Sequence, residues 1–317
     1  MMVVAGVGCS SSSAGVVATM DASSFDPDAG GADSSSVGAD SAVRDSSVSY
    51  DGAAIIAARP YKLHVPAGLD ATKPSPLVVM FHGFGATGTL EEFELRLTPT
   101  SDAHGFLYAY GEGTTDKDGK TFWNATDGCC DIYASHVDDV SYFDAIVDDV
   151  SAKYNVDKKQ VFVVGHSNGG FMAHRLACDR AARVAGIVAL AGDNYLDATK
   201  CTPSEHVSIL QVHGDADATI LYAGGSTSMG PYPSANASVA SWAPKNGCTG
   251  ALAPIGVTLD LVSDLPGNET KVETYGGCPA GVDVTLWTIQ GGSHVPSFNY
   301  PTWGEDIWGF LSTHPKP

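Results

Sequence analysis

One stretch constrains the fold more than any other, because an apolar strand, a glycine-flanked serine and a helical segment follow one another directly. Residues 161–164 predict a buried strand, and residues 171–180 have helical composition. Between them, Gly-His-Ser-Asn-Gly centres on Ser167. This spacing is typical of a nucleophilic serine on a strained strand-to-helix turn, where glycine two positions before and after leaves room. The alternative is a Gly-Ser turn without chemistry.

Strands and helices alternate along the rest of the chain. The patterns predict strands at 57–65, 77–81, 106–110, 184–190, 207–212 and 282–289, and helices at 137–154, 235–246 and 303–311. This alternation predicts an α/β fold with a mostly parallel, doubly wound sheet and helices on both faces. Because ligands bind at the carboxyl ends of parallel strands, polar residues that follow those strands are expected to share one site.

Four such residues are His82, Ser167, Asp217 and His294. The order serine, acid, histidine is that of the α/β-hydrolase catalytic triad. His294 is the histidine that is late, glycine-flanked and strand-terminal, so it is the predicted base. Asp193, Asp215 and Asp217 are all candidates for the acid on position alone, since each follows the end of a strand.

The segment after the strand at 77–81 allows two interpretations. Residues 83–88 fit the dinucleotide-binding pattern G-x-G-x-x-G, with Asp102 near the distance of a ribose-binding acid. Alternatively, His82-Gly83 opens the loop that supplies one oxyanion-hole N–H group, while the N–H of Asn168 supplies the other. The second interpretation is favoured because it explains this loop together with Ser167. It requires no cofactor.

The first fifty residues differ from the remainder in composition. Residues 1–9 are interpreted as a truncated secretory or lipoprotein signal ending at Cys9, which is the candidate lipidation site. Residues 10–52 are rich in Ser, Asp, Gly and Ala and are predicted to be a disordered tether. Residues 53–317 are the predicted catalytic domain. We therefore expect a bacterial protein that is secreted or held at the cell surface.

The charge of the chain bounds its partners. The net charge is −19 and the isoelectric point is about 4.6, without a basic stripe in the domain. Nucleic acid binding and electrostatic attachment to anionic lipid are therefore not expected. The expected partner is an ester substrate that is small, oligomeric or polymeric, membrane contact is expected only through Cys9, and the protein is expected to be a monomer.

Six cysteines lie in the predicted domain, an even number that suggests disulfides in an exported protein. A metal site is not expected, because no C-x-x-C occurs and adjacent cysteines cannot readily chelate one tetrahedral ion. The six are Cys129, Cys130, Cys178, Cys201, Cys248 and Cys278.

As a set, the motifs resemble those of secreted esterases of the polyhydroxybutyrate depolymerase and feruloyl or acetylxylan esterase type, over residues 59–311. The matching segments are His82-Gly83, Trp123-Asn124 with Cys129-Cys130, residues 138–140, 165–170, 172–173 and 175–178, His213 to Asp217, residues 246–248, Gly277-Cys278 and Gly291 to His294. The resemblance implies that Asp217 is the acid and that Phe84 supplies the second oxyanion N–H. It also implies a bond between Cys248 and Cys278, which leaves Cys129 and Cys130 to pair with Cys178 and Cys201 in an open order.

The chain departs from the family at two places. Val295-Pro296 stands where the family usually has Thr-Trp-Pro after the histidine, so an aromatic residue of the acyl pocket is missing there. Residues 110–113 read Tyr-Gly-Glu-Gly where the family has Tyr-Pro-Asp-Gly. The candidate substrate-binding residues are Trp123, which could instead be a core anchor, together with His166 and Tyr222.

These features predict a secreted serine ester hydrolase that acts on short-acyl, hydroxyalkanoate or feruloyl and acetyl polysaccharide esters. A feruloyl or acetylxylan esterase of the plant cell wall is the alternative within this class. A catalytically silent, surface-binding lipoprotein is the alternative from another class, and the complete set of triad residues counts against it. The absence of a propeller or lid domain before the core counts against a peptidase.

Overall fold

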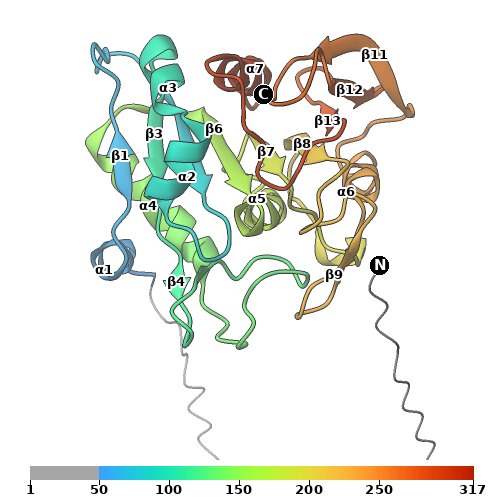
Figure 1. Cartoon of the computed structure of the whole chain (residues 1–317). Coiled ribbons are helices and arrows are strands. Elements are labelled where there is room, and N and C mark those ends of the chain that lie inside the picture. Colours follow the sequence, from blue (N-terminus) through green and yellow to red (C-terminus); the bar gives the residue numbers. More distant parts are fainter. Residues whose placement is uncertain (1–49) are drawn as a thin grey trace, which may run out of the picture. The chain divides into compact units, whose positions relative to one another are not determined.

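The computed structural model of the protein describes residues 50–317 (Figure 1). The predictions for residues 1–9, for Cys9 and for the tether as far as residue 49 lie outside this range. The tether was predicted to extend to residue 52, but Gly52 already opens a helix, α1 (Gly52–Ala58). None of the helices between residues 50 and 317 is long and apolar enough to cross a membrane.

A nine-stranded sheet forms the centre of the domain. In spatial order its strands are β1 (Lys62–His64), β3 (Leu107–Tyr110), β2 (Ser75–Phe81), β6 (Val156–His166), β7 (Gly186–Leu190), β8 (Ser208–Gly214), β13 (Val284–Ile289), β12 (Thr270–Tyr275) and β11 (Leu252–Leu259). The six strands from β3 to β13 run parallel to their neighbours, whereas β1, β12 and β11 are antiparallel to theirs. Figure 1 shows the sheet extending from β1 at the left to β11 at the right. The predicted α/β fold is thus confirmed.

Helices cover both faces of the sheet, as a doubly wound fold requires. They are α2 (Gly88–Leu95), α3 (Thr98–His104), α4 (Asp139–Lys153), α5 (Asn168–Asp179), α6 (Ala235–Trp242) and α7 (Thr302–Ser312), besides α1. Alternate residues of β2 face opposite sides. Leu77, Val79 and Phe81 pack in one buried cluster with side chains of α4, α5 and α6, while Val78 and Met80 pack in a second cluster with α7. The site lies where the central strands end.

The segment 57–65 was predicted to be a strand, and this prediction is wrong for its first part. Residues 52–58 form α1, which packs against α4, and the strand β1 is limited to Lys62–His64. The Arg59 guanidinium lies 3.8 Å above the Tyr142 ring and 2.5 Å from the buried Asp139 carboxylate. These contacts fix the start of the domain to α4, and Pro60 separates the helix from the strand.

The two edges of the sheet are irregular. β1 has three residues and pairs only with β3. β11 is largely exposed, and its register with β12 shifts between Pro254 and Thr258. Neither β11 nor β12 was predicted from the sequence. In β11, Pro254 and Gly256 interrupt the pattern and apolar side chains stand at exposed positions, so the usual alternation is missing.

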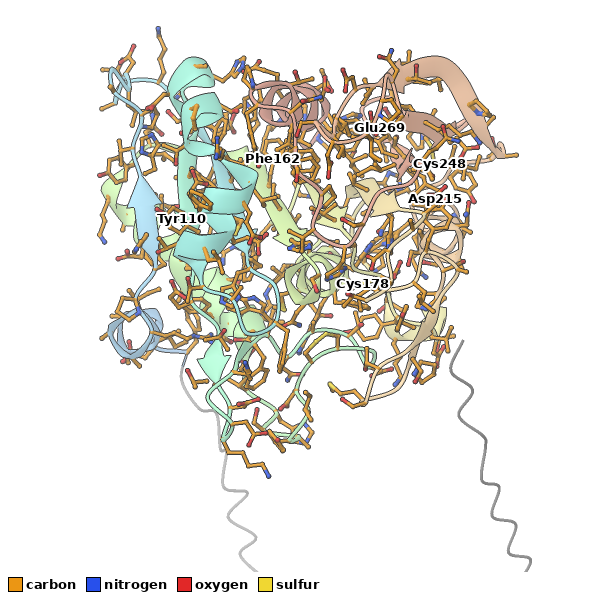
Figure 2. All side chains as sticks on the ribbon, in the orientation of Figure 1. Tyr110, Phe162, Cys178, Asp215, Cys248 and Glu269 are labelled. Atoms are coloured by element: carbon orange, nitrogen blue, oxygen red, sulfur yellow. A yellow bond between two sulfur atoms is a disulfide. The ribbon has the colours of Figure 1, made fainter. Side chains whose placement is uncertain are left out.

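Three disulfides join the six cysteines of the domain, and two of them differ from the predicted pairing. Cys248 bonds to Cys278, as the resemblance implies. Cys129 bonds to its neighbour Cys130, and Cys178 bonds to Cys201 across a Cα–Cα distance of 5.0 Å, so the expected sharing of these four is wrong. Figure 2 shows Cys178 near the middle of the domain and Cys248 toward its edge. The bonds therefore fasten separate parts of the chain.

Candidate active site

The nucleophile turn has the predicted geometry. β6 ends at His166, α5 begins at Asn168, and Ser167 between them has φ 55° and ψ −120°, a conformation that L-residues rarely adopt. A Cβ on Gly165 would collide with the backbone of Gly169, and one on Gly169 would collide with the carbonyl of Phe81. Glycine is thus required at both positions for β2, β6 and α5 to approach so closely.

Three side chains from three strand ends meet at this turn. His294, five residues beyond β13, places its Nε2 2.9 Å from the Ser167 hydroxyl. The His294 Nδ1 lies 2.7 Å from the Asp217 carboxylate, which follows β8. The structure therefore brings the predicted serine, histidine and acid into one continuous hydrogen-bond path, in the arrangement of a serine hydrolase.

The Asp217 carboxylate is held firmly. Its Oδ1 accepts hydrogen bonds from the backbone N–H groups of Thr219 at 2.8 Å and Ile220 at 2.9 Å, and its Oδ2 faces His294. Burial by itself would raise the pKa of Asp217, but the hydrogen bonds from His213 and His294 hold that pKa below its ordinary value. Asp217 is consequently an anion, with one oxygen bonded to backbone N–H groups and the other to the His294 ring.

The other two acid candidates lie elsewhere. Asp215 is exposed, and its carboxylate accepts a hydrogen bond from the Gly291 N–H at 2.6 Å; Figure 2 labels it just beyond β8. Asp193 is wholly buried and accepts a hydrogen bond from the Ser238 hydroxyl, and burial raises the pKa of Asp193 to about 7. Neither carboxylate is hydrogen-bonded to His294.

The loop after β2 lies against the serine. A Cβ on Gly83 would be 3.4 Å from that of Ser167. The N–H groups of Gly83, Gly85 and Ala86 are bonded to Glu91, Thr121 and Gly83 respectively, whereas within residues 50–317 the Phe84 N–H has no acceptor. In α5, the N–H of Asn168 precedes the first helical hydrogen bond, which runs from Phe171 to Ser167. Both predicted oxyanion donors therefore remain available for a ligand.

Trp123 does not line a pocket, contrary to its prediction as a substrate-binding residue. Its side chain is fully buried, stacked on Tyr142 and edge-on to Phe81, and its indole N–H donates to the His82 carbonyl at 2.9 Å. The Asn168 side-chain amide bonds both the Trp123 N–H, at 2.7 Å, and the Trp123 carbonyl, at 3.0 Å. Trp123 is the core anchor that ties the loop to the nucleophile's helix.

The other two candidate substrate-binding residues have partners in the protein. His166 is buried between Glu91 and the loop that carries His294, so the structure does not expose it to a substrate. Tyr222 is partly exposed, lies edge-on to His213, and its hydroxyl is bonded to Thr288 at 2.8 Å and Asn236 at 3.1 Å. The prediction for His166 is wrong in this structure, and that for Tyr222 stays a prediction.

Glu91 is a residue that sequence reasoning missed. It lies in the first turn of α2, fully buried beside the serine turn, and accepts a hydrogen bond from the Gly83 N–H at 2.9 Å. The available signal was Thr87, a helix N-cap residue followed by acidic residues, inside the segment that also fits a dinucleotide motif. The segment ends in a capped helix start, and its first residue, Gly83, lies beside Ser167, as the oxyanion-loop interpretation expects.

Fold and site together define an α/β-hydrolase with the geometry of a serine hydrolase. Residues 69–240 match the phospholipase/carboxylesterase family. The chain belongs to this family, and the prediction of a carboxylic ester hydrolase is confirmed at the family level.

Relatives and solved structures agree with this assignment. Feruloyl esterase B of Piromyces equi is 27% identical over 260 residues, covering 80% of this chain and 44% of that protein, so the chain spans less than half of that relative. Feruloyl esterase D of Neurospora crassa is 27% identical over 261 residues, covering 80% of this chain and 81% of that protein. An acetyl xylan esterase from Aspergillus awamori has a similar fold, with a TM-score of 0.56 and 15% identity, covering 80% of this chain and 93% of that one. The expected resemblance to feruloyl and acetylxylan esterases is thus confirmed.

Proposed function

We propose that the protein hydrolyses carboxylic esters through an acyl-enzyme formed on Ser167. His294 takes the hydroxyl proton as Ser167 attacks the ester carbonyl, and Asp217 orients the imidazole and stabilises its charged form. The observation that carries the proposal is the unbroken path from the Ser167 hydroxyl through both ring nitrogens of His294 to Asp217, with distances of 2.9 Å and 2.7 Å.

In the same proposal, the N–H groups of Phe84 and Asn168 stabilise the oxyanion of the tetrahedral intermediate. His294 then gives its proton to the leaving alcohol, and the acyl group remains on Ser167. Water, activated by His294 in the reverse sense, releases the carboxylic acid and restores the serine. Two observations support these donors: Asn168 follows Ser167 at the start of α5, and Phe84 follows Gly83, on which a Cβ would lie 3.4 Å from that of Ser167.

The proposed substrates are feruloyl or acetyl esters of plant cell-wall polysaccharide. The feruloyl esterases and the acetyl xylan esterase among the similar proteins support this class. Phe84, whose N–H is a proposed oxyanion donor, exposes 37% of its surface, and Val295, which follows His294, exposes 52%. Both side chains offer apolar contacts to an acyl group. Hydroxyalkanoate esters are the other class expected from the sequence.

The proposal is tested with Ser167→Ala and a panel of esters. The panel contains p-nitrophenyl acetate, methyl ferulate, acetylated xylan, a hydroxybutyrate oligomer and a polyhydroxybutyrate film. We expect the wild type to turn over at least methyl ferulate or acetylated xylan, and Ser167→Ala to lose activity by a factor of about 10³ or more at an unchanged melting temperature. Hydrolysis by the variant at a tenth of the wild-type rate would contradict the nucleophile. An inactive wild type would favour a binding protein.

The proposed location is an oxidising compartment outside the cytoplasm. The three disulfides support it, since such bonds persist under oxidising conditions. Lipidation at Cys9 remains a separate proposal, tested by mass spectrometry of the mature protein and a Cys9→Ala control. A monomer is the proposed state, which light scattering would check.

A further inference from the structure

A buried charged pair, Glu91 and His166, lies directly behind the candidate active site. The Glu91 Oε1 is 3.0 Å from the His166 Nδ1, and the two side chains expose 1% and 6% of their surfaces. The other carboxylate oxygen of Glu91 accepts the Gly83 N–H at 2.9 Å. The His166 Nε2 is 2.9 Å from the backbone carbonyl of His294. The proposed chemistry uses neither of these side chains.

The contacts of His166 fix its protonation state. Each ring nitrogen faces an acceptor, a carboxylate oxygen at Nδ1 and a carbonyl oxygen at Nε2. A neutral imidazole carries one N–H and can direct it at only one of these oxygens, so facing both requires the doubly protonated, positively charged ring. Burial alone would lower the pKa of His166, but the Glu91 carboxylate and the hydrogen bonds raise it to about 9. Glu94 on α2 also faces this ring and favours its charge.

The pair joins segments that the sheet alone leaves separate. Gly83 belongs to the loop that carries the Phe84 N–H, His294 lies in the loop after β13, and His166 is adjacent to Ser167. Two hydrogen bonds and one ion pair therefore link Gly83 through Glu91 and His166 to the backbone of His294. The strands beneath these loops are fixed by sheet hydrogen bonds, but the loops extend beyond the strand ends. The path is a direct link between the two loops.

We propose that Glu91 and His166 are positioning residues that hold the oxyanion loop and the loop of His294 at the spacing that ester hydrolysis requires. The inference rests on the proposed function, since it assigns a task within the same site. Losing the path would let the Phe84 N–H and the His294 imidazole move independently, and displacements of about 1 Å at such groups can cost on the order of 10²-fold in rate.

A cation site is the other interpretation of this cluster. Glu91, Glu94 and His166 offer ligand atoms that lie within 4.8 Å of one another. A metal ion at His166 would need an unprotonated nitrogen, whereas both of its nitrogens face acceptors. Glu91 Oε1 accepts no hydrogen bond from residues 50–317, so its 3.0 Å contact with the His166 Nδ1 is an ion pair in which the charged ring faces the carboxylate. The contacts therefore favour the ion pair, and metal content is an outcome of the test.

Two substitutions at one position separate hydrogen bonding from mere filling of space. In Glu91→Gln, the amide oxygen can accept from Gly83 and the amide N–H can donate to a neutral His166, whose Nε2–H still reaches His294. In Glu91→Leu, both contacts are lost. Glu92→Gln is the matched control, because within residues 50–317 the neighbouring carboxylate on the same helix accepts hydrogen bonds from the N–H groups of Leu97 and Thr98 and not from Gly83 or His166.

We expect Glu91→Leu to lower kcat by about 10²-fold with little change in KM, Glu91→Gln to stay within about tenfold of the wild type, and Glu92→Gln to equal it. A Glu91→Leu variant that folds and keeps more than a tenth of kcat would overturn the proposal. So would a Glu91→Gln variant as impaired as Glu91→Leu, or metal bound at one ion per chain after dialysis.

A spectroscopic measurement decides the case if Glu91→Leu fails to fold. Nitrogen-15 NMR of the wild type at pH 7.5 should show two protonated ring nitrogens for His166, and Glu91→Gln should show one. A single protonated nitrogen in the wild type would overturn the pair. This count does not depend on turnover, and labelling of Ser167 by a fluorophosphonate reports the nucleophile separately. Failure of the esterase proposal and failure of the positioning proposal are therefore distinguishable.

Discussion

Replacing Asp217 with asparagine should misplace a proton rather than simply remove a charge. One carboxylate oxygen of Asp217 accepts from two backbone N–H groups, those of Thr219 and Ile220. In Asp217→Asn the amide oxygen must take that place, since an NH₂ group cannot accept. The NH₂ group is then forced toward the His294 Nδ1, which in the wild type lies 2.7 Å from a carboxylate oxygen of Asp217. The imidazole can keep that contact only by holding its proton on Nε2, facing Ser167.

The cost follows from the tautomer. With a proton already on Nε2, His294 cannot take another from Ser167, so the reactive form is a minor population. For a serine hydrolase with this geometry, the same kind of substitution lowers kcat by about 10⁴, equivalent to about 5 kcal/mol of activation free energy. The fold should be retained, because both backbone hydrogen bonds to the side chain remain. Asp215→Asn is the control, since its carboxylate is exposed and bonds only the Gly291 N–H in the described part of the chain.

The assay compares kcat and KM for p-nitrophenyl acetate in the wild type and the two variants, with melting temperatures recorded for each. We expect Asp217→Asn to lose about 10⁴-fold in kcat with KM changed by less than about threefold, and Asp215→Asn to remain within about threefold of the wild type. A reversed ranking would refute the assignment of the acid. An Asp217→Asn variant with more than a tenth of wild-type kcat would refute the tautomer reasoning.

Two further predictions concern stability. The double variant Cys248→Ser with Cys278→Ser should lower the free energy of unfolding by about 3–4 kcal/mol, the chain-entropy value for a bond spanning 30 residues. KM should stay unchanged. A variant that loses activity as well as melting temperature would contradict this prediction. In the folded protein the pKa of His166 is about 9, above its ordinary value of 6.5. Protonation of His166 therefore stabilises the folded state, with its whole contribution present below pH 6.5 and lost as the pH rises through 9. Urea unfolding at pH 6.5 and 9.5 should show a fall of up to about 3 kcal/mol, absent in Glu91→Gln.

The parts of the fold that could be predicted are those where local chemistry and tertiary structure agree. The run before Ser167 is apolar because β6 is buried on both faces. The glycines on either side of Ser167 are needed because a side chain there would collide with neighbouring backbone in this turn. The order of Ser167, Asp217 and His294 is a property of the chain itself. These features could therefore be predicted from the sequence.

The features that escaped prediction depend on partners distant in sequence. Nothing local distinguishes Glu91 from an exposed helical glutamate, because its burial comes from the approach of α2 to the serine turn. Trp123 could equally have faced a substrate, and contacts such as those with the Asn168 amide and the Tyr142 ring place it in the core. Disulfide pairing is likewise set by which Cα atoms the fold brings together, as for Cys178 and Cys201.

The irregular edges of the sheet bear on how the protein behaves at high concentration. A long, flat edge strand displays a row of unpaired N–H and C=O groups on which another chain can add, and this is a common start of aggregation. Here one edge, β1, offers three residues. The other, β11, carries Pro254, a left-handed glycine at 256 and a break in register. Neither edge is a good template for strand addition. We therefore expect the nine-stranded sheet to resist pairing with a strand of a neighbouring molecule.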